Sequence, residues 1–543
     1  MKKIFLILVL AFAFFLRIWQ IDQNPPSLNW DEVSHGYNAY SILKTDKDEW
    51  GVKFPLIFRA YGDYKLPVYI YLTAVSESIF GLNPFSVRLV SVLSGLGLVL
   101  LAYLITRKIT KNEGISLFSA FLTALSPWSL FLSRVAVEAN LAASLFALGI
   151  YFLFDWLEDH SLKSLILLAL FWGFSLHTYN SARLLVPLFT VAVAFLVVRA
   201  KQFRQLVVFL SLIFIFFVPV INQFFDESGS ARFGWVSLID QGTINRIIEK
   251  RTNSSLPAFA SKILYNRPSF FIFYAAKNYL SNLSPDYLFF RGGSHYQFSQ
   301  VGHELLFLVS APFLLIGLLK ILVKGNPKER VVMLWFFLAF IPSAITRDAP
   351  HVLRSILILP TPMILSSLGL EWMTGKISNG SFFKGQLIIW VLIISVLISF
   401  YKWWGDYQNI YPKAYSWAWQ YGYKELVGFL KENYAKYDKI IITKKYGEPH
   451  EFILFWWPWD PQKFRDDPSL IRYFRSDWYW IDGFDKFLFA NDWEIDKVGS
   501  GKWEVGSGRK LLITSPGNYP EGWRKIETIN FLDEKPVFEI LEK

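Results

Sequence analysis

Two adjacent acids stand in the stretch NWDEVSHGYNAY, which follows the apolar opening MKKIFLILVLAFAFFLRIW of the chain. Asp31 and Glu32 are candidates for acid–base chemistry, because a carboxylate beside an apolar phase is costly to keep charged without a function or a partner. One carboxylate could remove a proton from a hydroxyl, and a pair could hold a cation. The alternative is a structural one, in which Asp31 caps a surface helix.

Further polar residues stand where later apolar runs end. Arg134 and Glu138 are spaced i, i+4 and therefore share one face of a helix. The full set is Lys65 in YGDYKLPVY, Arg134 and Glu138 in LSRVAVEAN, His177, Tyr179 and Arg183 in HTYNSARLL, and His351 and Arg354 in TRDAPHVLRS. Each could instead be a solvated loop charge, a structural ion pair or a side chain that reaches toward lipid headgroups.

Composition indicates the elements that must position these residues. The 543-residue chain is 53% hydrophobic and 18% charged, and uncharged runs recur at 89–106, 115–133 and 205–225. Each approaches the ~20 residues that span hydrocarbon, and shorter runs bring the expected total to about eleven spans. The sequence therefore predicts a polytopic α-helical membrane protein. It contains no cysteine, which excludes disulfides and thiolate chemistry.

The distribution of basic residues predicts the orientation. The formal net charge of +11 could indicate nucleic acid, but alternate connections between the apolar runs carry most of the lysines and arginines, which is the positive-inside pattern. We therefore expect no nucleic-acid partner, a cytoplasmic N-terminus, and segments 21–86, 223–301 and 402–543 outside the cytoplasm. This alternation of inner and outer segments requires that the apolar segment 66–82, which contains Glu77, does not cross the membrane. We therefore expect it to be an interfacial or re-entrant helix.

A change in composition after residue 401 predicts a second domain. Helical spacing in YKELVGFLKENYAKY alternates with the strand-like stretches DKIIITK, RKLLITS and KPVFEIL. We expect a transmembrane catalytic domain over 1–401 and a small extracytoplasmic α/β domain over 402–543. The aromatic stretch FWWPWD could stack on sugar rings, and the alternative is a packed aromatic core.

The grouped charges predict a reaction class. Arginines and lysines at a membrane surface suit a lipid-borne phosphate, which guanidinium groups bind in a forked geometry. Carboxylates would repel that phosphate, but they make sense if one deprotonates a second substrate or if they hold a cation. A base, an acceptor, a sugar and a phosphate leaving group together amount to a glycosyl transfer.

The landmarks WDE, the Lys-x-Pro entry to the interfacial helix, SRVAVE, HTYNSARLLVP and HVLRSILILP resemble those of GT-C glycosyltransferases. Within them the chain is most similar to bacterial members of glycosyltransferase family 39, the protein O-mannosyltransferase and lipid A aminoarabinose transferase group. The resemblance implies a sugar donor on a polyprenyl phosphate, an inverting transfer, and Asp31 as the general base with Glu32 beside it. It also implies donor-phosphate contacts from Lys65, Arg134, Arg183 and Arg354, with Glu138, His177, Tyr179 and His351 in supporting positions.

Three alternatives stay open at this point. A transporter or flippase of lipid-linked sugars would also hold intramembrane charges, but it predicts internal repeats that the sequence does not display. A lipid-linked polysaccharide polymerase or ligase fits the same charges. A divalent cation is a further option, with Asp31 and His35 as candidate ligands at i, i+4 spacing. The acceptor is left open as a protein, a glycan or a lipid.

Overall fold

The computed structural model describes residues 2–225, 236–378, 382–498 and 508–543. The described chain divides into two compact units. Unit 1 comprises 1–19, 91–133 and 137–404, and unit 2 comprises 20–90, 134–136 and 405–543. The segment that carries Asp31 thus belongs to the same compact unit as the C-terminal residues, although the two are far apart in the sequence.

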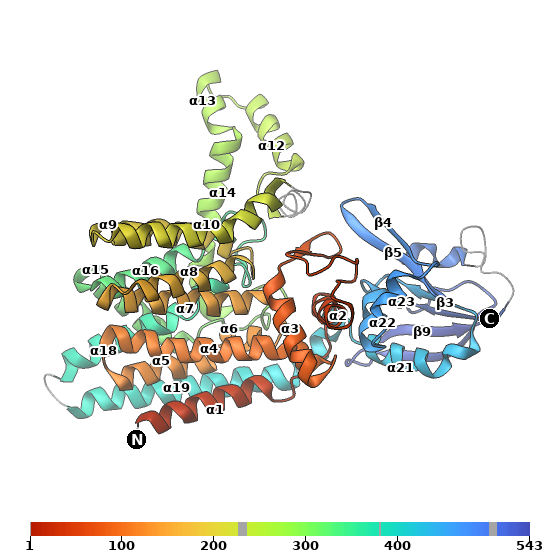
Figure 1. The fold of residues 1–543 in the computed structure, drawn as a ribbon, viewed down its shortest axis with the longest axis horizontal. Helices are drawn as coiled ribbons and strands as arrows, with labels where there is room; N and C mark the ends of the chain where they lie inside the picture. The colour runs from red at the N-terminus through yellow and green to blue at the C-terminus, as the bar shows by residue number, and fades with distance from the viewer. Residues whose placement is uncertain (1, 226–235, 379–381, 499–507) are drawn as a thin grey trace. The chain divides into compact units, whose positions relative to one another are not determined.

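Unit 1 is built from helices (Figure 1). They are α1 (Lys2–Ile18), α5 (Glu113–Leu125), α6 (Pro127–Ser133), α7 (Glu138–Asp159), α8 (Leu162–Leu176), α9 (Ala182–Arg199), α10 (Phe203–Phe225), α12 (Gln241–Thr252), α13 (Ala258–Leu264), α14 (Arg267–Asn282), α15 (Ala311–Lys324), α16 (Pro327–Leu338), α17 (Ile341–Ala344) and α18 (Thr361–Ser378). Two more, α4 (Pro84–Thr110) and α19 (Phe382–Asn409), include residues of both units.

Six helices of the described residues are long and apolar enough to cross a membrane, or seven if the bent pair α5 and α6 forms one span. The six are Pro84–Thr110, Glu138–Asp159, Ala182–Arg199, Phe203–Gln223, Ile356–Lys376 and Gly385–Asn409. The bend of 56° between α5 and α6 falls at Ser126, directly before Pro127, where the proline disfavours helical geometry in the preceding residue. The protein is therefore a multi-pass membrane protein.

Small residues allow the helices of unit 1 to approach closely. A Cβ atom on Gly317 of α15 would lie 2.1 Å from the Leu365 carbonyl oxygen of α18, and one on Gly369 would lie 1.9 Å from the Phe313 oxygen. Such small-residue contacts are typical of helix packing in membranes, where association depends on van der Waals contact rather than on the hydrophobic effect. The glycines in these two apolar helices thus mark an interhelical contact.

Unit 2 contains a seven-stranded mixed sheet in the order β4-β5-β6-β3-β7-β9-β8. The strands are β3 (Lys439–Thr443), β4 (Ile471–Arg475), β5 (Trp478–Phe484), β6 (Phe487–Ala490), β7 (Lys510–Thr514), β8 (Arg524–Asn530) and β9 (Pro536–Glu542). Central β3 is parallel to β6 and β7, and the other pairs are antiparallel. The predicted strand-like stretches correspond to β3, β7 and β9.

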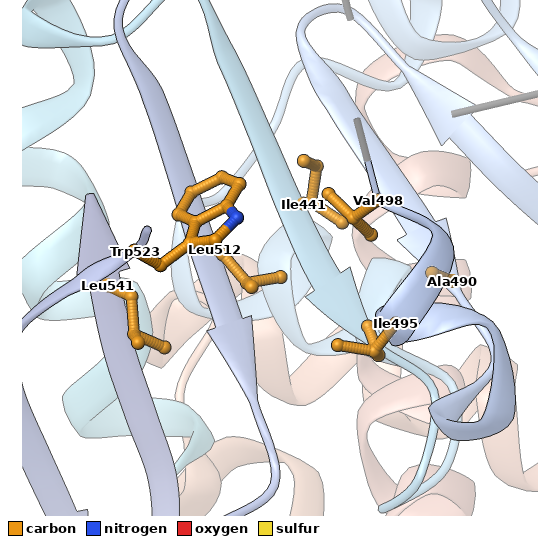
Figure 2. Close-up of a cluster of buried hydrophobic side chains, with 7 residues drawn as sticks. All are labelled: Ile441, Ala490, Ile495, Val498, Leu512, Trp523 and Leu541. Carbon is orange, nitrogen blue, oxygen red and sulfur yellow. The ribbon is translucent and has the colours of Figure 1, made fainter. Parts of the chain in front are cut away.

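The sheet is covered on both faces at its centre. The three isoleucines of β3 have no exposed surface, as expected for a central parallel strand. Figure 2 shows one buried cluster beside β3, in which Ile441 and Leu512 of the sheet lie near Ile495 and Trp523. The helices of this domain are α20 (Tyr411–Tyr415), α21 (Tyr423–Asn433), α22 (Pro449–Trp456) and α23 (Pro461–Arg465).

The segment 20–90 adds α2 (Trp30–Thr45), α3 (Pro67–Phe80) and the small hairpin of β1 (Phe58–Arg59) and β2 (Tyr64–Lys65) to unit 2. Helix α2 packs on α22 of the C-terminal region: a Cβ atom on Gly36 would lie 2.5 Å from the Phe455 ring. Tyr37 donates a hydrogen bond from its hydroxyl to the Trp459 carbonyl at 3.2 Å. The C-terminal region therefore holds the helix that carries the two acids.

Candidate active site

Asp31 lies in the first turn of α2. Asn29 caps this helix: its side chain accepts a hydrogen bond from the Glu32 backbone N–H at 3.0 Å, and the Glu32 carboxylate accepts one from the Asn29 N–H at 3.1 Å. This capping box fixes the start of the helix. Asp31 forms an ion pair with Lys65 of β2, and its side chain is 39% exposed against 12% for Lys65. The structure thus brings together two predicted site residues, and the acid is accessible to solvent.

Glu32 has a different environment from its neighbour. Its carboxylate is fully buried and binds the guanidinium of Arg88 through two contacts of 2.9 and 3.0 Å. It also accepts a hydrogen bond from the Ala136 N–H at 2.8 Å. With both oxygens engaged by donors of the protein and no exposed surface, Glu32 holds the local structure.

Arg88 was not among the residues predicted from the sequence. Its remaining N–H groups donate to the carbonyls of Ile21 (2.6 Å), Pro25 (3.2 Å) and Ser27 (2.6 Å). The side chain therefore ties the segment before α2 to the start of α4. The sequence did hold a signal, because an arginine near the end of a long apolar run is uncommon unless it has a partner or a function.

Arg134 is also fully buried in unit 2. Its Nε donates to the Tyr407 hydroxyl at 3.2 Å and its Nη2 donates to the Asn24 carbonyl at 2.7 Å. The guanidinium carbon lies 5.5 Å from the centre of the Tyr407 ring. A buried guanidinium with such contacts is rigidly held, which suits either a structural role or the binding of a phosphate.

The other predicted residues lie in unit 1, where two loops meet. Ser181, in the loop before α9, donates to the Arg354 carbonyl at 2.9 Å, which joins HTYNSARLL to TRDAPHVLRS. Arg183 donates to the Gln223 side chain at 2.6 Å and to the Leu176 carbonyl at 3.2 Å. Arg354 donates to the Thr346 hydroxyl at 3.0 Å, and its backbone N–H donates to the His351 ring at 3.3 Å.

The remaining supporting residues are His177 and Tyr179, in HTYNSARLL, and Glu138. His177 ends α8 and its Nε2 lies 2.8 Å from the Phe216 carbonyl oxygen. Tyr179 is buried with 3% of its surface exposed. Glu138 is the first residue of α7, where the helix dipole favours a negative charge.

The described residues contain no group of three or more His, Cys, Asp and Glu side chains arranged to hold a metal ion. His35, the predicted partner of Asp31 in such a site, is buried on α2, with its ring 5.2 Å from that of Tyr69. The structure thus places His35 among aromatic neighbours rather than in a metal cluster.

The structure also reveals buried acids that sequence reasoning did not single out. Glu49, in the loop after α2, and Glu451 of α22 come together where the first loop contacts the C-terminal region. Burial raises the pKa of Glu49 to about 7, and burial with Glu49 as a neighbour raises the pKa of Glu451 well above its ordinary value. The pKa of Glu448 rises to about 7 because of burial, and burial lowers that of His450 to about 3.

The stretch FWWPWD is only partly buried in unit 2, since its three tryptophans keep part of their surface exposed. Phe455 is buried, and the rings of Trp457 and Trp459 lie 5.4 Å apart and both contact Phe487. Phe455 thus fits the aromatic-core alternative, while the tryptophans keep ring surface on which a sugar could stack.

A multi-pass helical fold with acids and bases at helix ends is the architecture expected of the membrane glycosyltransferase class that the sequence predicts. Residues 65–222 match the family model described as dolichyl-phosphate-mannose-protein mannosyltransferase. This match confirms the resemblance predicted from the sequence. It includes Lys65, Arg134 and Arg183 and begins after Asp31.

Solved structures share the fold. ArnT from Cupriavidus metallidurans bound to undecaprenyl phosphate aligns with a TM-score of 0.58 and 13% identity over 99% of this chain and 97% of that one, and its apo form with 0.55 and 11% over the same shares. The apo oligosaccharyltransferase of Archaeoglobus fulgidus aligns with a TM-score of 0.53 and 13% identity over 84% of this chain and 63% of that one. No curated protein sequence matches the chain.

Proposed function

We propose that this protein transfers a sugar from a polyprenyl-phosphate donor to an acceptor hydroxyl at the outer face of the membrane, with inversion and with Asp31 as the general base. The class of enzyme follows from the family match over residues 65–222. The donor class is supported by the mannosyl-phosphate lipid in the family's description and by the undecaprenyl phosphate bound to the similar ArnT.

The observation that carries the assignment of the base is the contrast between the two adjacent acids. Glu32 is fully buried against Arg88, whereas the Asp31 side chain is 39% exposed and contacts Lys65. A general base must come within hydrogen-bond reach of the acceptor proton, about 2.6–3.2 Å. Only Asp31 of the pair meets that requirement without the rupture of a buried ion pair. A single displacement needs one such carboxylate, unlike a retaining glycosidase, in which a second carboxylate is the nucleophile.

Lys65, Arg134, Arg183 and Arg354 are proposed to bind the donor phosphate. An ammonium group carries three N–H donors, so Lys65 can contact Asp31 and a phosphate oxygen together. In that arrangement Lys65 would stabilise the phosphate as the glycosidic bond breaks. Asp31 would take the proton of the acceptor hydroxyl, which attacks the anomeric carbon from the face opposite the phosphate. The guanidinium groups of the three arginines would add forked contacts to the phosphate oxygens.

The finer topology is part of the proposal. We infer about eleven spans, because helices shorter than a full span, such as α1, α8, α15 and α16, can complete the set where the bilayer thins around them or their flanking residues reach the interface. The N-terminus would be cytoplasmic and residues 402–543 extracytoplasmic, with 1–401 as the catalytic part. Reporter fusions after Arg107 and Lys201 should read cytoplasmic and a fusion after Tyr421 external, and a cytoplasmic reading at Tyr421 contradicts this orientation.

The test of the function is a transfer assay with the purified full-length protein. It would be given a panel of polyprenyl-phosphate sugars with protein, glycan and lipid acceptors, and product would be followed by mass spectrometry. We expect transfer from at least one lipid donor, and much slower transfer with Asp31→Asn. Transport of an intact lipid-linked sugar across proteoliposomes without transfer would instead support a flippase.

A further inference from the structure

Two arginines of unit 2 form a stacked assembly with a tryptophan and a tyrosine. The guanidinium carbon of Arg59, in β1, lies 5.0 Å from the Trp50 ring centre and 4.7 Å from that of Tyr479. That of Arg472, in β4, lies 4.7 Å from the Trp50 ring centre. The rings of Trp50 and Tyr479 meet edge to face at 5.3 Å. The four side chains come from the first loop and from the hairpin of β4 and β5, two strands that Figure 1 labels.

The assembly brings two like charges together. Among the residues that the structure describes, no carboxylate lies within 4.0 Å of the Arg59 or Arg472 guanidinium nitrogens. Burial lowers the pKa of Arg472. The negative charges of Glu49 and Asp48 oppose this change, whereas the positive charges of Arg59 and Arg465 lower the pKa further. Two half-buried guanidiniums held this way are costly unless another anion compensates them.

The neighbouring acid does not supply that compensation in full. Glu49 accepts a hydrogen bond from the Trp50 indole at 3.2 Å, but burial raises its pKa to about 7. A large share of Glu49 is therefore neutral near pH 7. The third arginine, Arg465, is engaged elsewhere, since it donates to the Ser41 hydroxyl at 3.1 Å and to the Asp48 carbonyl at 3.0 Å.

Stacking does not occupy the in-plane donors of the guanidiniums, although Arg59 also has the Tyr64 hydroxyl as a hydrogen-bond neighbour. A guanidinium that lies over an aromatic ring uses its flat face, while its N–H groups point outward in the plane and can fork onto an oxyanion. Strand β4 is at the edge of the sheet, and its residues other than Arg472 are exposed. Arg472 is thus held at an open edge rather than inside the domain.

We propose that Arg59 and Arg472, stacked on Trp50 and Tyr479, form a subsite for an oxyanion, a phosphate or a carboxylate, carried by the acceptor. The assignment to the acceptor rests on the proposed transferase function; the anion site itself does not. A connection to the Asp31–Lys65 pair supports it. Arg59 and Lys65 belong to the same hairpin, in which Arg59 pairs with Tyr64 and Phe58 with Lys65, and the Tyr64 and Tyr479 hydroxyls lie 3.1 Å apart.

The anion site can be tested without a transfer assay. Phenylglyoxal labels accessible arginines, and peptide mass spectrometry of the full-length protein in zwitterionic detergent would follow Arg59, Arg472 and Arg475. We expect inorganic phosphate or glucuronate to slow the labelling of Arg59 and Arg472, and sodium chloride at equal ionic strength to have no such effect. Arg475, exposed on the same strand, should label equally throughout. If phosphate, glucuronate and sodium chloride all left the labelling rates of the three arginines equal, the proposal would be overturned.

A variant separates specific binding from general screening. In Arg472→Gln, half-protection of Arg59 should require about tenfold more phosphate, because one charge-assisted contact is lost. Arg475→Gln is the matched control and should leave the protection of Arg59 unchanged. If both variants have the same effect, the site as described here does not exist. Continued protection of the fully buried Arg88 and Arg134 from labelling would establish that Arg472→Gln is folded.

Two further arms identify the source of the anion. Nanodiscs of phosphatidylglycerol would be compared with nanodiscs of phosphatidylcholine, and protection by the anionic lipid but not by soluble phosphate would overturn the assignment to the acceptor. In a transfer assay, phosphate should compete with the acceptor in the wild-type protein and much less in Arg472→Gln. Transfer that phosphate affects equally in both would also overturn it, while the absence of any transfer would bear on the proposed function and leave the labelling result standing.

Discussion

The guanidinium of Arg88 binds both carboxylate oxygens of Glu32, at 2.9 and 3.0 Å, and neither side chain has exposed surface. One residue earlier in the chain, Asp31 turns to a solvent-accessible position beside Lys65. Successive residues of a helix point about 100° apart, so two adjacent acids of one motif can have different surroundings and different roles. The buried pair anchors the start of α2, and the exposed acid faces the region where a substrate could enter.

Asp31→Asn should leave the protein folded and lower transfer by roughly 10²- to 10⁴-fold, the range for a positioned general base. Binding of the donor lipid should persist, since the substitution removes a negative charge near the proposed phosphate position. Rates from purified protein and binding of a polyprenyl phosphate would be measured. Asp63→Asn, in the same loop, is the matched control and should retain transfer; near-normal transfer by Asp31→Asn would shift the role of base to another acid.

Glu32→Gln should act on stability first. Removal of one partner of a buried ion pair costs roughly 3–5 kcal/mol, because the other charge is left in a low-dielectric site. The midpoint of thermal unfolding should fall, and transfer should fall with the folded fraction. If instead the melting temperature stayed the same and transfer alone were lost, Glu32 would have to take part in the reaction.

Arg183→Ala should weaken donor binding before it affects the chemical step. A lost charge-assisted hydrogen bond corresponds to roughly tenfold to a hundredfold in the dissociation constant. Titration of the purified protein with undecaprenyl phosphate gives this constant directly. Arg199→Ala, at the opposite end of α9, is the control and should bind as the wild type does; equal binding by both variants would remove Arg183 from the phosphate contacts.

Stability should fall as the pH rises from about 4.5 through about 7, because of the pair Glu49 and Glu451. The ordinary pKa of Glu49 is 4.5 and its folded pKa is about 7. Below the lower value both states hold the proton and the stabilisation is complete; as the pH passes the upper value the folded protein must keep a charge buried. The higher pKa of Glu451 extends the decline.

Thermal unfolding of the full-length protein between pH 5 and pH 8 measures this slope. Glu49→Gln keeps the size of the side chain and removes its titration, so its melting temperature should vary less with pH than that of the wild type. Glu425→Gln, exposed on α21, is the control and should retain the wild-type slope. A steeper decline in Glu49→Gln would contradict the assignment.

Local sequence patterns predicted much of the fold. Long uncharged runs identify membrane helices because a span must satisfy its own backbone hydrogen bonds, and the central strands are recognisable because both of their faces are buried. The stretches DKIIITK, RKLLITS and KPVFEIL therefore predicted β3, β7 and β9. The hairpin β4–β5 escaped notice, since its strands mix arginines and aromatics without the alternation of a half-buried strand.

The sequence by itself determined that this is a multi-pass membrane protein of a glycosyltransferase type, with two acids after the first helix. Only the tertiary structure decided what each acid does. Glu32 meets Arg88 across 56 residues, and Glu49 meets Glu451 across a far longer separation. Periodicity reports which face of an element is apolar, but it does not report which distant side chain will neutralise a buried charge. That depends on the packing of segments 20–90 and 405–543 into one compact unit.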